Sequence, residues 1–318
     1  MKESHVSQKP VSKQGARVGS RAKKAPGVSA AAHARADRRV FGHKLSKPAK
    51  KKLYDFLLYA CIVVLVVSVC LLINTLWQRH EIKYEEQAAA ASAALIASER
   101  SAAQAASAAE LQTVTETEAF AETDTTAETE NVPLSPEFSR LYGINSDFIG
   151  ILRFADMSLY VCRGRDNEYY LTHKFDGSEN PAGMVFLDAS CVFESGDNYL
   201  LHGHNMDDGS RFGKLKRYLR RTYLDAHPIF SFDTILGNHE YRVAAVFKAS
   251  FISSDANYFY YQKARFESKA EYDAYLARAK QLSAVDTGFT PAYGKPLLIL
   301  STCTDRDTER LVVLCGEV

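Results

Sequence analysis

A cysteine and an arginine stand at the ends of two neighbouring apolar runs near the C-terminus. Cys303 follows the apolar residues 297–302, and Arg310 opens the next run after a short polar stretch. A hairpin places the end of one strand beside the start of the next, so we expect both side chains to share one groove. A nearby guanidinium favours the thiolate form of cysteine and can also stabilise an oxyanion. This pattern favours nucleophilic catalysis; the alternative is a core cysteine and a solvated arginine.

Two histidines follow another apolar run. Residues 199–201 are succeeded by His202, Gly203 and His204. A histidine at a strand end beside glycine can approach a substrate backbone, and imidazole titrates near neutral pH, so His204 is a candidate acid/base. Because His202 and His204 are two positions apart, they would face the same side of a strand, and a zinc hydrolase is a weaker alternative. No local motif supplies a third metal ligand.

These segments belong to a mostly β region that spans residues 133–318. Apolar or alternating runs predict strands at 148–154, 184–188, 198–203, 240–250, 296–302 and 310–315. Helical periodicity appears at 214–224 and 267–283. Many short strands with few helices predict a closed β-barrel.

An uncharged apolar run, residues 56–73, precedes this region. As a helix it would span about 27 Å, which matches the hydrocarbon thickness of a bilayer. We therefore predict a single transmembrane anchor at 53–77. A cleaved signal peptide is the alternative, but the run is longer than a usual signal-peptide core.

Charges flank the predicted anchor asymmetrically. Residues 1–52 are basic, with Lys50, Lys51 and Lys52 directly before the apolar run, whereas glutamates follow it. The positive-inside rule predicts a cytoplasmic tail at 1–52 and an extracellular remainder. The tail lacks interleaved aromatic residues, so we expect no nucleic-acid partner.

Residues 78–132 are rich in Ala, Glu and Thr. Alanine and glutamate favour helix, but a helix whose apolar residues are nearly all alanine has little to bury. The acidic, Thr-rich end is typical of a disordered spacer. We therefore predict an extracellular stalk.

The six cysteines do not predict a disulfide framework. Cys61 and Cys70 lie in the predicted anchor, which leaves Cys162, Cys191 and Cys315 besides Cys303, without CxxC spacing. Pairing of Cys162 with Cys191 and the role of Cys315 stay open, as does the oligomeric state.

The two chemical segments together resemble those of class B sortases, cysteine transpeptidases of Gram-positive bacteria. HGHNMDDGSRFG is similar to the family's histidine motif, ILSTC to its nucleophile motif, and ERLVV carries the arginine that follows. The segments DNEYYLTHKFDG, AGMVFLD and AHPIFSFDT agree as well, and the resemblance runs in order over residues 135–318.

The resemblance implies an eight-stranded sortase-like β-barrel with a long helix before the nucleophile strand. It implies Cys303 as nucleophile, His204 as acid/base and Arg310 as oxyanion partner. Ser301 and Thr302 match positions that help to bind the sorting-signal peptide or to shape the oxyanion site in relatives. No metal or organic cofactor is implied.

The implied reaction is cleavage, after Thr, of the C-terminal sorting signal of secreted proteins. A thioacyl enzyme forms, and the acyl group passes to an amine of a cell-wall precursor; class B relatives often take NPxTN-like signals. One alternative is a pilus-polymerising sortase that uses a pilin lysine as acceptor. A more remote alternative is a non-catalytic, stalked surface-binding protein.

The charge asymmetry gives a first testable prediction. Protease added to intact protoplasts should remove residues 135–318 and spare the N-terminal tail, as detected by antibodies against each part. Protection of the C-terminal domain would contradict the predicted orientation.

Overall fold

The computed structural model describes residues 47–114, 135–193, 198–304 and 308–318. Most of the predicted basic tail and the Thr-rich end of the predicted stalk lie outside these residues. Contacts divide the chain into two units, Met1–Ile62 and Val63–Val318, and the second contains the barrel.

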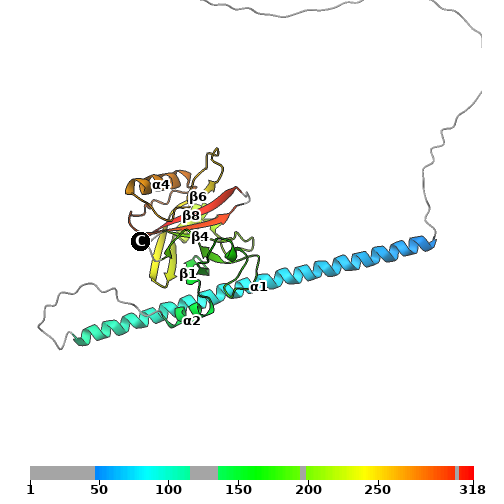
Figure 1. Ribbon diagram of the computed structural model, residues 1–318, viewed down its shortest axis with the longest axis horizontal. Helices are drawn as coiled ribbons and strands as arrows, with labels where there is room; N and C mark the ends of the chain where they lie inside the picture. Colours follow the sequence, from blue (N-terminus) through cyan, green and yellow to red (C-terminus); the bar gives the residue numbers. More distant parts are fainter. Residues whose placement is uncertain (1–46, 115–134, 194–197, 305–307) are drawn as a thin grey trace, which may run out of the picture. The chain divides into compact units, whose positions relative to one another are not determined.

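Eight strands close into a barrel in the order β1-β2-β3-β4-β7-β8-β6-β5, as predicted (Figure 1). Most neighbours are antiparallel, but β2 pairs with β3 and β4 pairs with β7 in parallel. The strands are β1 (Phe148–Phe154), β2 (Met157–Cys162), β3 (Val185–Leu187), β4 (Tyr199–His202), β5 (Ile229–Thr234), β6 (Gly237–Ser250), β7 (Leu297–Cys303) and β8 (Glu309–Glu317). Because the sheet is closed, strands far apart in sequence become neighbours.

Each predicted strand is present, and two further strands, β2 and β5, were not predicted. The predicted helix at 214–224 is instead two short elements, the 3₁₀ helix η3 (Leu215–Leu219) and α3 (Arg221–Ala226). They are separated by Arg220, which has an extended backbone. A short 3₁₀ helix, η1 (Tyr169–Leu171), lies between β2 and β3.

The helix before β7 forms as predicted. This helix, α4 (Lys269–Leu282), begins after Ser268, whose side chain accepts a hydrogen bond from the Glu271 amide. Its apolar side packs against β6, with Tyr275, Leu276 and Ala279 in the barrel's core cluster. The cap and the apolar face together explain why the helix forms here.

The N-terminal helix α1 (Lys47–Val114) contains the predicted membrane span. Its residues 56–73 are all exposed except Ala60, which is half-buried. Among the described helices, α1 is the one long and apolar enough to cross a membrane. This fits the predicted anchor by length and composition.

The part of α1 after the span packs against the barrel, contrary to our expectation that it has little to bury. Ala89, Ala93 and Ile96 are buried in one cluster with residues of β1, β2 and the short helix α2 (Pro136–Ile144). Polar contacts accompany them. Ser92 Oγ lies 3.1 Å from Tyr160 Oη, and Arg100 donates to Asp233 at 2.9 Å.

Alanine explains why this packing was missed. Each alanine methyl buries little area, so the helix shows no large-residue stripe in the sequence. Small side chains nevertheless allow the helix backbone to lie close to the bulky side chains that share its cluster, such as Tyr160, whose hydroxyl contacts Ser92. Most of the apolar area in the interface between α1 and the barrel therefore belongs to barrel side chains, and the sequence of the helix gives little sign of the interface.

The buried face of α1 gives the second prediction. Ile96→Ala removes a side chain that is fully buried, and such changes cost about 2–5 kcal/mol of unfolding free energy. Urea unfolding of the full chain in detergent, followed by aromatic fluorescence, measures the loss. The adjacent Leu95, 51% exposed, provides the matched control Leu95→Ala, which should change stability by less than about 0.5 kcal/mol. Equal effects of the two variants would contradict the packing.

Candidate active site

The β7–β8 hairpin brings the two residues of the first chemical segment together. Cys303 ends β7 and is in register with Arg310 at the start of β8. From Leu297 to Thr302, β7 is buried, and Cys303 is its first exposed residue. The thiol is therefore presented beside the guanidinium-bearing residue at the mouth of the barrel, as the hairpin argument predicted.

Parallel pairing of β4 with β7 brings the histidine segment to the same end. His202 is in register with Ser301, the Gly203 amide donates to the Ser301 carbonyl, and Thr302 Oγ1 donates to the Gly203 carbonyl at 2.6 Å. Gly203 permits this close approach. A Cβ atom there would lie 2.9 Å from the ring of Phe212.

His204 follows directly and has a defined ring orientation. Its Nε2 lies 2.8 Å from the carbonyl oxygen of Leu171, at the end of η1. A carbonyl only accepts, so Nε2 carries a proton and donates it, which leaves Nδ1 for other partners. The hydrogen bond to Leu171 thus fixes Nε2 of His204 and leaves Nδ1 for proton transfer.

All five residues selected from the sequence line one cavity of about 320 Å³. His204, Cys303 and Arg310 share it with Ser301 and Thr302. The remaining lining residues come from loops and strands around the barrel mouth: Asn167, Leu171, Phe186, His202, Gly203, Phe251, Tyr261 and Gln262.

Comparison with known proteins shows which family the chain resembles. No protein-family model matches the chain. Sortase B of Listeria monocytogenes is 33% identical over 184 residues, which cover 57% of this chain and 72% of the relative. A solved Bacillus anthracis protein described as similar to sortase B is 30% identical with a TM-score of 0.53, over 66% of this chain and 93% of that one. The Staphylococcus aureus sortase B–substrate complex is 26% identical with a TM-score of 0.52, over 57% and 85%.

The chain belongs to the class B sortases.

Within this sortase, the predicted substrate-binding residues are held in the cavity wall. Ser301 Oγ lies 2.7 Å from Tyr261 Oη, and both side chains are buried. Burial raises the pKa of Tyr261 to about 12, so its hydroxyl stays protonated near neutral pH. Arg310 lies over the ring of Phe251, with its Cζ 5.3 Å from the ring centroid. The guanidinium is therefore oriented by an aromatic face.

Exposure separates Cys303 from the other cysteines of the barrel. Cys162, Cys191 and Cys315 are buried, and no disulfide joins any of the chain's six cysteines, all of which lie among the described residues. Burial raises the pKa of Cys162 and Cys315 well above the usual value. These two remain thiols, so the core-cysteine alternative describes them better than Cys303.

His202 has a structural partner. Its Nε2 donates to Asp188 Oδ2 at 2.7 Å. Among the described residues, no group of three His, Cys, Asp or Glu side chains is arranged to hold a metal ion.

Sequence reasoning missed four residues that shape the site. The Leu171 carbonyl is a backbone atom and carries no sequence signal. Tyr261 and Phe251 come from the connection between β6 and α4, where aromatic residues resemble ordinary core positions. Asp188 lies in the segment AGMVFLD, which was recognised only as a family signature.

The pair Asp188–His202 gives a pH-dependent prediction. Burial opposes ionisation of Asp188, but hydrogen bonds from His202 and Ser190 outweigh it and lower its pKa from 3.8 to about 2. A depressed carboxyl pKa stabilises the fold above the unfolded value and loses this contribution as the pH falls toward 2. Asp188→Asn should therefore reduce the unfolding free energy by about 2 kcal/mol at neutral pH.

Chemical unfolding between pH 7 and pH 2 measures this difference, which should shrink below about pH 4. Asp225, in an exposed ion pair with Arg221, supplies the control Asp225→Asn, which should have little effect. A difference between Asp188→Asn and wild type that stays constant over the whole range would contradict the assignment.

Proposed function

We propose that this sortase is a cysteine transpeptidase that cleaves a C-terminal sorting signal after Thr and transfers the acyl group to an amine. The observation that carries the proposal is the register pairing of exposed Cys303 with Arg310 in the cavity that His204 also lines. The three groups have the chemistry for nucleophilic attack, oxyanion stabilisation and proton transfer.

In the first half-reaction, the Cys303 thiolate attacks the Thr carbonyl carbon of the bound signal. Arg310 stabilises the negative charge that develops on the carbonyl oxygen. His204 donates a proton to the leaving amine as the peptide C–N bond breaks, and a thioester to Cys303 remains.

In the second half-reaction, an incoming amine attacks the thioester carbonyl. His204 accepts a proton from this amine, a new amide bond forms and the Cys303 thiolate leaves. Transfer to an amine rather than to water makes the reaction a transpeptidation. None of these steps calls for a metal or organic cofactor.

The peptide site is proposed from the cavity and from a relative. The solved Staphylococcus aureus sortase B is described as a complex with substrate. In this chain, Ser301 and Thr302 line the cavity that also contains Cys303, where an extended peptide could contact them. We infer that secreted proteins with a C-terminal sorting signal are the acyl donors.

The anchor supports a location at the outer face of the cell membrane. The apolar part of α1 is preceded by three lysines and followed by glutamates, so the tail is cytoplasmic and the barrel extracellular in this proposal. Exported donors and cell-wall precursors both reach that face.

Substitution of the three residues tests the mechanism. Cys303→Ala should abolish thioacyl formation, because it removes the nucleophile. His204→Ala should slow turnover about 10²–10⁴-fold, the usual contribution of general acid–base catalysis. Arg310→Lys keeps the charge but loses the planar fork, so we expect a loss of about 10²-fold.

The measurement uses a panel of quenched NPxTN-like peptides with triglycine, a lysine-containing pilin peptide or water as acceptor, plus mass spectrometry of the trapped adduct. Cys162→Ala and Cys315→Ala are the controls and should keep activity. An adduct on another cysteine, or wild-type turnover by Cys303→Ala, would refute the mechanism. Preference for the lysine peptide would favour the pilus-polymerising alternative.

A further inference from the structure

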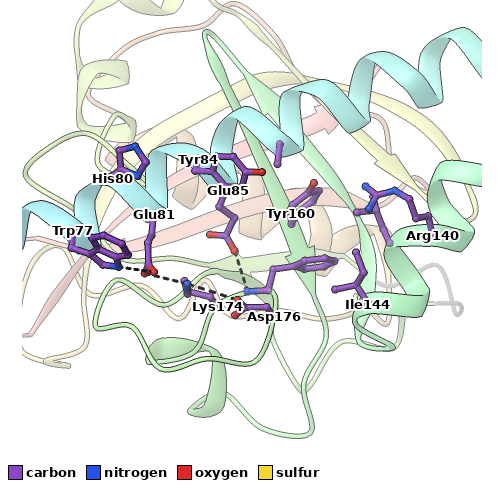
Figure 2. Close-up of a pocket in the computed structure, with 13 residues that line it drawn as sticks. Trp77, His80, Glu81, Tyr84, Glu85, Arg140, Ile144, Tyr160, Lys174 and Asp176 are labelled. Atoms are coloured by element: carbon purple, nitrogen blue, oxygen red, sulfur yellow. Dashed lines mark hydrogen bonds and ion pairs between the residues drawn. The ribbon is translucent and has the colours of Figure 1, made fainter.

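Three glutamates of α1 face the loops that surround His204. Glu81, Glu85 and Glu86 follow the apolar span within about four turns of helix. Glu81 Oε2 lies 3.2 Å from Lys174 Nζ, and Glu85 Oε1 accepts a hydrogen bond of 3.0 Å from the Phe175 amide. Figure 2 shows both contacts between the helix and the loop that carries Lys174. The membrane-proximal part of the helix therefore holds the loop that follows Leu171.

The same helix holds the loop that follows His204. Glu85 Oε2 accepts a hydrogen bond from the guanidinium of Arg211, and Glu86 Oε1 accepts one of 3.2 Å from the Arg211 amide. The Arg211 side chain is only 3% exposed, and its backbone adopts a left-handed conformation with φ of 50°. A buried guanidinium requires a counter-charge, and a non-glycine residue at positive φ requires a surrounding that holds it.

Each of the two loops makes a hydrogen bond to His204. The first supplies the Leu171 carbonyl that accepts from His204 Nε2 at 2.8 Å. The second supplies the Phe212 amide, adjacent to Arg211, which donates to the His204 carbonyl at 3.0 Å. Glu85 is bonded to both loops, one through each carboxylate oxygen, so a single side chain of the anchor helix constrains the ring and the backbone of the candidate acid/base.

We propose that Glu85 is a positioning residue for His204, so that docking of the anchor helix is a condition for acyl transfer. Glu85 acts through Arg211 and the loop from Leu171 to Phe175, and it contacts no reacting atom. The inference rests on the proposed function for its kinetic consequences. The structural part of the inference, that Glu85 influences the orientation of the His204 ring, does not depend on the identity of the substrate.

The principal variant is Glu85→Gln in the full chain in detergent micelles. Glutamine keeps the length of the side chain and an acceptor for the Phe175 amide, but it removes the carboxylate that pairs directly with the Arg211 guanidinium. Misplacement of a catalytic group by about 1 Å costs on the order of 10²-fold, so we expect kcat to fall roughly 10- to 100-fold. KM for the peptide should change little, and alkylation of Cys303 by iodoacetamide should keep its wild-type rate.

Glu99→Gln is the matched control on the same helix. Glu99 Oε2 accepts a hydrogen bond of 3.3 Å from the Glu137 amide, about 21 Å along the helix from Glu85. This variant also loosens helix docking, but at α2 rather than at the His204 loops. An unchanged kcat in Glu99→Gln beside a low kcat in Glu85→Gln would support positioning. Equal losses of kcat in the two variants would mean that Glu85 only stabilises the fold, and would overturn the proposal.

A double variant separates positioning from the cost of a buried charge. Glu85→Gln combined with Arg211→Gln leaves no unpaired guanidinium, so the fold should recover thermal stability. If Glu85 and Arg211 act as one unit on His204, kcat of the double variant should stay as low as that of Glu85→Gln. Recovery of kcat together with stability would overturn the proposal.

The ring of His204 gives a readout that needs no substrate. In ¹⁵N-histidine-labelled wild type, assigned with His204→Asn, the imidazole should show the protonated Nε2 that the Leu171 contact requires. In Glu85→Gln the spectrum should shift toward a mixture of tautomers, and in Glu99→Gln it should not. A wild-type spectrum in Glu85→Gln would refute the coupling. If the wild type transferred no peptide of the panel, the proposed function would fail while this signal still decided the positioning.

Discussion

Strand β7 fixes the relative positions of the residues in the candidate site, because it pairs with β4 on one side and β8 on the other. The strand is buried up to Thr302, so its register cannot slip without moving apolar side chains out of the core. Cys303 emerges where this constraint ends. Parallel pairing with β4 and antiparallel pairing with β8 then deliver His204 and Arg310 to the same rim, one from each side.

The mouth of the barrel is further ordered by loops. The ring of His204 depends on a carbonyl in η1, and the guanidinium of Arg310 lies against Phe251 from the connection after β6. Loops are usually the mobile part of a barrel, yet here one of them is tied to α1 through Glu85. Helix α1 thus packs against the domain that carries the candidate site, and it also connects this domain to the apolar span.

Much of the site was predictable because it depends on local sequence. The apolar run before Cys303, the polar turn and Arg310 require a hairpin, and any hairpin of this length places the two residues together. The motif His202-Gly203-His204 likewise marks a strand end with a close backbone approach, which the contact of Gly203 with Phe212 explains. The resemblance to class B sortases joined these separate signals, and the solved relatives confirm the barrel.

The sequence by itself determined the apolar span, the order of most strands along the chain and the candidate catalytic residues, since each is marked by a local sequence pattern. Only the tertiary structure decided which strands became neighbours, which backbone carbonyl holds His204, and that Cys303 is exposed while Cys162 and Cys315 are buried. It also decided the packing of α1. The sequence of an alanine-rich helix does not reveal which of its faces will be buried, because most of the large apolar side chains in the contact belong to the barrel and not to the helix.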